Sequence, residues 1–275
     1  MTRRQLLTAS VLAAPPLMLV ASTTAGMYQI GTLRIREMSV PIAGLRPELD
    51  GVRIVQISDT HYGRFTDKDF TNNLVSSINQ LDADLHLVTG DLIDNSLLDL
   101  DHGLNMLRRI KNQHPIFCCV GNHDLFMSRH GFIERVRASG VNLLVDESQR
   151  IKIRGAPLDI YGADWSTSET DMANSVNYMV RQKEPDVPGI MLAHHPHVFD
   201  YAADKGIDLT LSGHTHGGQL MLTKSIGPGP LMYRYWSGLY EKQGKHLAVS
   251  NGVGNWFPLR INAPAELLHI RLVAV

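Results

Sequence analysis

Apolar runs in this chain repeatedly end in carboxylate, imidazole and amide side chains. The run PIFCCV ends at Val120, and Asn122, His123 and Asp124 follow almost at once. Asn, His and Asp are poor strand formers and are costly to bury without partners. On a loop at the end of a buried strand, however, all of them can point at one place. We therefore expect this segment to form one corner of a functional site.

Four further runs end in the same way. Each run is short, apolar and rich in β-branched residues, which is typical of a buried strand. The carboxyl ends of parallel strands form one edge of a sheet, where sites are assembled from the loops. The sequence therefore predicts that distant segments bring carboxylates, imidazoles and an amide together. The residues that follow these four runs are Asp59 and His61, Asp91, His194 and His195, and His214 and His216.

Stretches with helical periodicity separate the predicted strands. Leu100, Leu104, Leu107 and Ile110, for example, share one face of a helix. Alternating strands and helices predict right-handed crossovers and a mostly parallel sheet. The last third of the chain is strand-rich without a helical stripe, which suggests a second sheet packed on the first. The expected fold class is α/β, a two-sheet α/β sandwich with its site at the C-terminal ends of the strands.

The N-terminal segment differs from the rest of the chain. Arg3 and Arg4 precede a weakly apolar stretch that ends in small residues at Ala25, and TRRQLL resembles a twin-arginine export signal. We assign 1–26 to a signal or, less favoured, a membrane anchor, and 27–275 to a single catalytic domain. If the signal is used, the twin-arginine machinery exports the protein to the extracytoplasmic face or the inner membrane. Otherwise the protein stays in the cytoplasm.

The net charge argues against a nucleic-acid-binding protein, and the two cysteines argue against a fold held together by disulfides. The formal net charge of -1 argues against a nucleic-acid partner, which usually requires a basic excess. Cys118 and Cys119 are adjacent, and disulfide geometry fits poorly across one peptide bond. We expect both to be small apolar residues of a core strand. His86, inside the run DLHLV, is likewise expected to be a partnered core residue.

The candidate ligands suit two divalent cations. In each of the pairs Asp59/His61 and His214/His216, an extended backbone would direct both side chains to the same side. Imidazole and carboxylate suit Mn, Fe, Zn or Ni, and the lack of thiolate argues against a structural zinc. The candidates are too many for one ion. A carboxylate can bridge two ions about 3.5–4 Å apart, the arrangement used for phosphoryl transfer.

The order of these motifs resembles the calcineurin-like metallophosphoesterase superfamily. The resemblance covers the chain from about residue 50 to its end. GHTHGGQ and the closing NGVGNWFPLR further resemble a small bacterial branch that often carries twin-arginine signals. The matching blocks are Asp59-Thr60-His61, Gly90-Asp91, Gly121-Asn122-His123-Asp124, His194 and Gly213-His214-Thr215-His216.

The resemblance implies a role for each block. His123 would steady the phosphoryl oxygens and protonate the leaving group, and Asp124 would orient its ring. A water or hydroxide between the metals would attack phosphorus in line. Asp94 stands where purple acid phosphatases have an iron-binding Tyr, so such an iron is not expected. One metal would be held by Asp59, His61, Asp91 and His216, and the other by Asp91, Asn122, His194 and His214.

We expect a dimetal phosphoesterase, with Mn as the first choice of metal, that hydrolyses phosphodiester or phosphomonoester bonds. His195 is a candidate substrate-binding residue. One alternative is a pyrophosphatase of a lipid precursor such as UDP-2,3-diacylglucosamine. The stretch 231–240, LMYRYWSGLY, would then be an apolar lip, although ordinary packing near the site is favoured. The alternative from another class is a non-catalytic metal-bound scaffold, which the presence of His123 disfavours.

Overall fold

The computed structural model describes residues 26, 31–66, 68–223 and 225–275. The predicted targeting segment, apart from Gly26, lies outside the described residues. Within the described part of the chain, no helix is both long enough and apolar enough to cross a membrane.

The first sheet combines the beginning, the first half and the end of the described chain. Its strand order is β1-β12-β2-β3-β4-β5. Strands β2 to β5 run parallel, whereas β12 is parallel to β1 and antiparallel to β2. The bounds are β1 (Leu33–Ile42), β2 (Arg53–Ile57), β3 (Leu85–Thr89), β4 (Phe117–Cys119), β5 (Asn142–Leu143) and β12 (Ala265–Ala274).

The second sheet is built mainly from the middle of the chain. Its order is β10-β11-β9-β8-β7-β6. Strands β7, β8, β9 and β11 run parallel, and β6 and β10 lie antiparallel at the two edges. The bounds are β6 (Glu147–Ile153), β7 (Ala156–Gly162), β8 (Gly189–Leu192), β9 (Leu209–Ser212), β10 (Gly238–Lys242) and β11 (Lys245–Val249).

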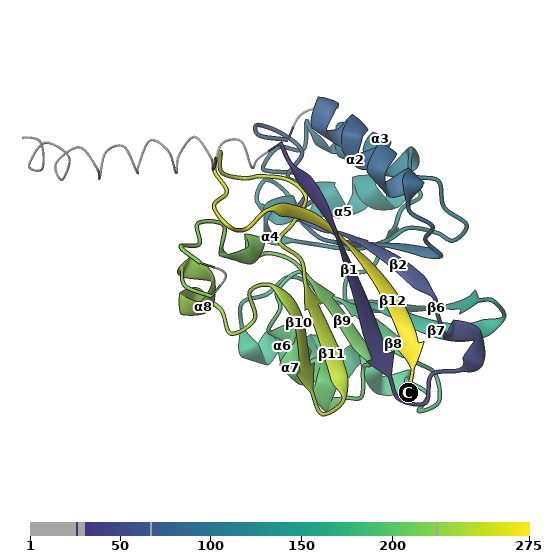
Figure 1. The fold of residues 1–275 in the computed structure, drawn as a ribbon. Helices are drawn as coiled ribbons and strands as arrows, with labels where there is room; N and C mark the ends of the chain where they lie inside the picture. Colours follow the sequence, from purple (N-terminus) through teal and green to yellow (C-terminus); the bar gives the residue numbers. More distant parts are fainter. Residues whose placement is uncertain (1–25, 27–30, 67, 224) are drawn as a thin grey trace, which may run out of the picture.

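Helices cover the outer faces of both sheets. Figure 1 shows α2, α3 and α5 over the first sheet and α6 and α7 over the second. Ser128 and Ser168 cap α5 and α6 by accepting a backbone N–H with their hydroxyl groups. The bounds are α2 (Lys68–Gln80), α3 (Leu100–Arg108), α4 (Asn122–Leu125), α5 (Arg129–Ala138), α6 (Glu169–Met179), α7 (Val198–Asp204) and α8 (Pro228–Met232), with 3-10 turns η1 (Pro47–Leu49), η2 (Val180–Gln182) and η3 (His216–Gly218).

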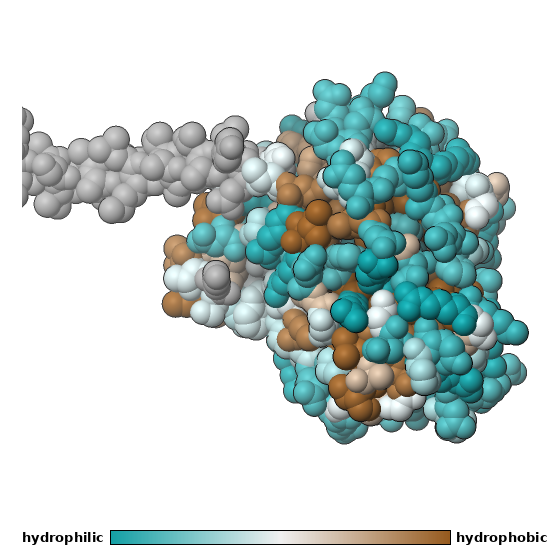
Figure 2. All heavy atoms as spheres, turned by 45° about the vertical axis from the view of Figure 1, so that its right-hand side comes forward, coloured by the Kyte–Doolittle hydropathy of each residue, from teal (hydrophilic) through white to brown (hydrophobic). Residues whose placement is uncertain are grey.

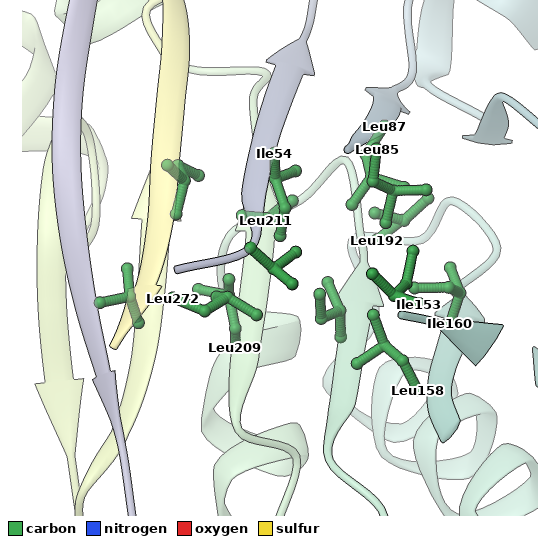
Figure 3. Close-up of a cluster of buried hydrophobic side chains, with 14 of the residues drawn as sticks. Ile54, Leu85, Leu87, Ile153, Leu158, Ile160, Leu192, Leu209, Leu211 and Leu272 are labelled. Carbon is green, nitrogen blue, oxygen red and sulfur yellow. The ribbon is translucent and has the colours of Figure 1, made fainter. Parts of the chain in front are cut away.

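The two sheets pack face to face through aliphatic side chains. Leu85 and Leu87 from the first sheet meet Leu192, Leu209 and other residues from the second (Figure 3), and all of them are buried. The central parallel strands are buried on both faces, which explains why their sequences are apolar runs rather than alternating patterns. The predicted fold class, an α/β sandwich of two sheets, is confirmed.

Some predicted details are confirmed and others are wrong. Cys118 and Cys119 are free and buried in β4, as expected. His86 is buried in β3, but its Nδ1 has no hydrogen-bond partner in the described structure. The strand-rich tail does not form the second sheet by itself, because β12 returns to the first sheet between β1 and β2. Strand β6 was not predicted, because it is an exposed edge strand with a largely polar sequence.

Candidate metal centre

The C-terminal ends of strands from both sheets converge at one site. Asp59 and His61 follow β2, His216 follows β9, and Asp91 follows β3. The Nε2 atoms of His61 and His216 are 3.0 Å apart. Nε2 of His216 lies 3.4 Å from Oδ1 of Asp59, and Nε2 of His61 lies 3.6 Å from Oδ2 of Asp91. These four side chains form the first cluster of the centre.

A second cluster shares Asp91 with the first. Nε2 of His194, which follows β8, lies 3.0 Å from Oδ2 of Asp91. Nδ1 of His214 lies 3.1 Å from Oδ1 of Asn122, and the rings of His194 and His214 are 5.2 Å apart between centroids. The structure thus brings every candidate ligand of the sequence analysis to this site, with Asp91 between the two clusters. Whether each of them binds a metal stays a prediction.

Left-handed backbone directs many of these side chains into the centre. The φ angles are 52° at Asp59, 43° at His61, 53° at Asp91, 71° at His214 and 49° at His216. Non-glycine residues rarely adopt positive φ, and such strain concentrates at functional sites. The expectation that an extended backbone aligns each Asp-x-His or His-x-His pair is therefore wrong, because β2 and β9 end before the pairs begin.

Glycine is required where the strand-end loops approach each other. A Cβ atom at Gly121 would lie 2.5 Å from the amide nitrogen of Asp91 and closer still to its carboxylate. A Cβ at Gly213 would overlap Oδ2 of Asp59 in the same way. Because no side chain fits at either position, the loops can pack tightly enough to bring Asp59 and Asp91 into one centre.

The buried carboxylates of the centre favour the binding of a cation. Asp59 and Asp91 are both buried, and burial raises the pKa of Asp59. For Asp91, burial is outweighed by His194 and His61, which hold the pKa of that carboxyl below its usual range. For His194, burial acts to lower the pKa, but Asp91 and Asp59 raise it to about 10. Buried carboxylates of this kind need compensating positive charge.

The ring nitrogens of the centre also fit divalent cations. Two imidazole nitrogens only 3.0 Å apart, as in His61 and His216, hold either a proton or a cation between them. Nε2 of His194 is buried and faces the carboxylate of Asp91, while its Nδ1 lies 2.7 Å from the carbonyl oxygen of Thr89. A carbonyl behind Nδ1 is the usual support for a histidine that binds a metal through Nε2. The set of nitrogen and oxygen donors suits the same ions that the sequence predicted.

Asp124 does not lie against the ring of His123, so the expectation that it orients this ring is not met. Its carboxylate instead accepts backbone N–H groups of Asp91, Leu92 and Gly121 at 2.8–2.9 Å. The N–H of Ile93 also donates to Asp124, at 3.2 Å, so this carboxylate accepts four backbone N–H groups. Asp124 therefore fixes the loop that carries Asp91. A buried carboxylate at the start of a helical turn is suited to collecting such donors.

Asp94 occupies the place that the sequence analysis gave to Asp124. Nδ1 of His123 contacts the carbonyl oxygen of Asp94 and lies 3.5 Å from its carboxylate. The same carboxylate is 3.6 Å from Nδ1 of His61. Asp94 was expected only as the replacement for a tyrosine. Its position three residues after Asp91 was the available signal.

Comparison with known proteins identifies the family. Residues 52–218 match the calcineurin-like phosphoesterase family. The chain belongs to this family. The predicted resemblance is confirmed, and the match includes every candidate ligand described above.

Three relatives illustrate the range of the family. An uncharacterized metallophosphoesterase of Helicobacter pylori (strain J99) is 29% identical over 252 residues, which cover 90% of this chain and 66% of that protein. Phosphodiesterase YaeI of Escherichia coli is 28% identical over 228 residues, covering 80% of this chain and 82% of YaeI. UDP-2,3-diacylglucosamine pyrophosphatase LpxG of Chlamydia muridarum is 24% identical, covering 81% of this chain and 84% of LpxG. This phosphoesterase chain thus spans about two thirds of the Helicobacter protein.

A buried arginine supports the first cluster of the phosphoesterase centre from behind. The side chain of Arg260 is 0% exposed, and its guanidinium lies 3.1 Å from Nδ1 of His216. It also donates to the carbonyl oxygens of Asn251, Gly254 and Ala263. Burial lowers the pKa of Arg260 to about 10, against the opposing effect of Asp59 and Glu266. The motif NGVGNWFPLR was noted only as a resemblance, and no contact of its Arg260 with the centre was predicted.

His195 lies next to the second cluster without facing Asp91. Its ring centroid is 5.3 Å from that of His214 and 5.6 Å from that of Trp165. Burial lowers the pKa of His195 to about 4, so the ring is neutral near neutral pH. Trp165 also lies 4.8 Å from the ring of His214 and forms a wall of the site that the sequence analysis missed. Binding of substrate by His195 stays a prediction.

Proposed function

We propose that this chain is a phosphoester hydrolase that works with two divalent cations sharing Asp91. The observation that carries the proposal is the pair of Asp/His clusters joined at that residue, with Oδ2 of Asp91 3.0 Å from His194 and 3.6 Å from His61. A bridging carboxylate is the arrangement that sites with two cations use for phosphoryl transfer.

The donor atoms divide between two cations. Asp59, His61 and His216 would hold one cation, and Asn122, His194 and His214 the other. Mn is our first choice, with Fe, Zn or Ni as alternatives, because imidazole and carboxylate donors suit all four. When bound, the cations supply positive charge to the phosphoryl oxygens and lower the pKa of a water between them.

His123 would handle the leaving group. Its side chain is partly exposed at the edge of the centre, whereas Asp59, His61 and Asp91 are buried. Because Nδ1 faces Asp94, Nε2 is the nitrogen that would exchange a proton with the leaving oxygen. Asp94 holds the ring in this orientation, as a general acid requires.

The proposed substrate is a phosphodiester or phosphomonoester. Cleavage of a pyrophosphate bond in a lipid precursor is the second candidate, supported by the likeness to LpxG. A metal-bound scaffold without activity is disfavoured, because Asp94 and His123 retain the geometry of a proton-transfer pair. No nucleic-acid partner is proposed, given the formal net charge of -1.

Export remains part of the proposal. The twin-arginine-like segment supports an extracytoplasmic or membrane-associated location, and it lies outside the described residues. Relatives from Danio rerio and Bos taurus are named transmembrane proteins with a metallophosphoesterase domain, which also supports association with a membrane. We propose that residues 27–275 form the single catalytic domain in either location.

Hydrolysis of bis(4-nitrophenyl) phosphate tests the proposed function. The full chain, purified with Mn, should release 4-nitrophenol, lose this activity on dialysis against a chelator, and regain it when Mn is returned. Activity that persists after complete removal of metal would contradict the proposal. Metal bound without hydrolysis of any phosphoester would instead support the scaffold.

A further inference from the structure

A groove with a volume of about 310 Å³ opens directly beside the metal centre. One end of the groove is formed by residues of the centre itself, and the other walls come from the segment around α8 and from the loop before Arg260. Tyr233 lies at the boundary, with its hydroxyl group 3.2 Å from Nε2 of His214. The lining residues used below are His214, His216, Pro228, Met232, Trp256 and Phe257.

The walls of the groove are mainly apolar away from the metal centre. The polar lining residues Thr215 and Gln219 donate to backbone carbonyl oxygens of the protein. Among its described lining residues, none is Asp, Glu, Lys or Arg. The ring of Trp256 lies 6.3 Å from that of His216, so the apolar surface begins at the ligands. A polar occupant such as a sugar or a nucleotide would lose hydrogen bonds to water along these walls without replacing them.

The mouth of the groove continues into exposed apolar side chains. Leu222, Ile226, Leu231 and Met232 are between 58% and 86% exposed, and we call them the apolar rim. Figure 2 shows hydrophobic atoms on the lobe that carries α8, at the left of the view. Exposed apolar side chains gathered beside a site mark a surface for a ligand, a lipid or a protein. Ordinary packing was expected for residues 231–240. Tyr235 is buried and fits this expectation, whereas Leu231 and Met232 are exposed.

We propose that the groove binds the hydrocarbon chain of an amphiphilic phosphoester. This inference rests on the proposed function, because the phosphoryl group must lie at the metal centre for the attached hydrocarbon chain to reach the groove. The groove shares His214 and His216 with the centre, so the group that fills it during catalysis is the one attached to the bound phosphoryl group. The apolar rim continues the apolar walls of the groove to the protein surface, where the hydrocarbon chain of the substrate would enter.

A homologous series of substrates tests the proposal. The 4-nitrophenyl phosphodiesters of methanol, butanol and octanol, each below its micelle concentration, place the same reacting bond on chains of increasing length. We expect kcat/KM to rise with each added CH2, by up to about fourfold while the chain lies in the groove. Equal values across the series would overturn the proposal.

A binding measurement separates the groove from the proposed function. Octylphosphonate and methylphosphonate are titrated into the Mn-loaded chain by calorimetry, and we expect the octyl compound to bind at least about 100-fold more tightly. If no ester of the series is hydrolysed, the proposed function is contradicted, and this titration alone decides the groove. Equal affinities for the two phosphonates would overturn the groove proposal.

A variant of the groove should reduce the dependence on chain length. Met232→Asn places an amide at the mouth, and we expect the octyl-to-methyl ratio of kcat/KM to fall at least about tenfold. Leu98→Asn changes another exposed apolar residue, one that does not line the groove, so it should keep the ratio of the parent. If the series shows no chain-length dependence and Met232→Asn abolishes a dimer seen by size exclusion, the groove binds a second copy and the proposal is wrong.

Discussion

The carboxylate of Asp94 lies 3.5 Å from Nδ1 of His123, and the carbonyl oxygen of Asp94 contacts the same nitrogen. One residue thus supports the ring through both its main chain and its side chain. Asp124, the nearer residue in sequence, is held away by the backbone N–H groups that it accepts. We therefore propose Asp94 and His123 as the proton-transfer pair of this centre.

Replacing the members of this pair should affect catalysis to different extents. His123→Gln removes the proton donor, and we expect kcat to fall by about 100-fold or more while bound Mn is unchanged. Asp94→Asn keeps the main-chain contact, so a smaller loss of about tenfold is expected. Steady-state kinetics and elemental analysis check both variants. Asp101→Asn, an exposed carboxylate, is the control, and an active His123→Gln would contradict the assigned role.

Gly121→Ala should disrupt the metal centre without touching a ligand. Its new methyl group would overlap the carboxylate and amide of Asp91, which must then move. We expect loss of bound Mn and a fall in kcat/KM of at least about 100-fold, because small displacements of reacting groups have effects of this size. The matched control is Gly31→Ala, where an added Cβ meets no atom within 4 Å. Normal Mn binding by Gly121→Ala would show that the close approach is not needed.

Arg260→Gln should destabilise the fold. The variant leaves carbonyl oxygens of Asn251, Gly254 and Ala263 buried without their donor, which costs about 3 kcal/mol or more. For a chain of this size the melting temperature should fall by about 10 °C. Thermal unfolding followed by circular dichroism measures the change. A melting temperature equal to that of the parent would contradict this role.

His86 should make the fold more sensitive to acid. Burial lowers the pKa of His86 in the folded protein, so the unfolded chain binds a proton more readily. The free energy of unfolding therefore falls as the pH drops below the ordinary histidine value of 6.5. His86→Leu removes this effect, so its stability relative to the parent should be greater at pH 5.5 than at pH 8. Urea unfolding in a chelator measures this difference, and equal relative stabilities at the two pH values would contradict the prediction.

The sequence was sufficient for the parts of the centre that depend on strand ends. Asp59, Asp91 and His194 follow buried apolar runs, and parallel strands bring such positions to one edge. The contacts that other residues make to His123 and His216 could not be predicted from strand ends. Asp94 and Arg260 reach His123 and His216 through loops whose paths depend on tertiary packing.

The same distinction applies to the fold. Buried strands such as β3 and β9 were predicted because their sequences are continuous apolar runs. The position of β12 was not, because pairing between strands distant in sequence leaves no local signal. The positive φ of Asp59 and His214 was also missed, since the surrounding loops impose it rather than the residues themselves.

A count of the metals bound to the purified chain, before and after Asp91→Asn, tests the central claim most directly. With Mn supplied, elemental analysis should give about two ions per chain, and anomalous scattering from a crystal should place them on either side of Asp91, about 3.5–4 Å apart. Asp91→Asn should lose at least one of the two. A parent chain that saturates at one ion or none, or two ions that do not share Asp91, would contradict the account.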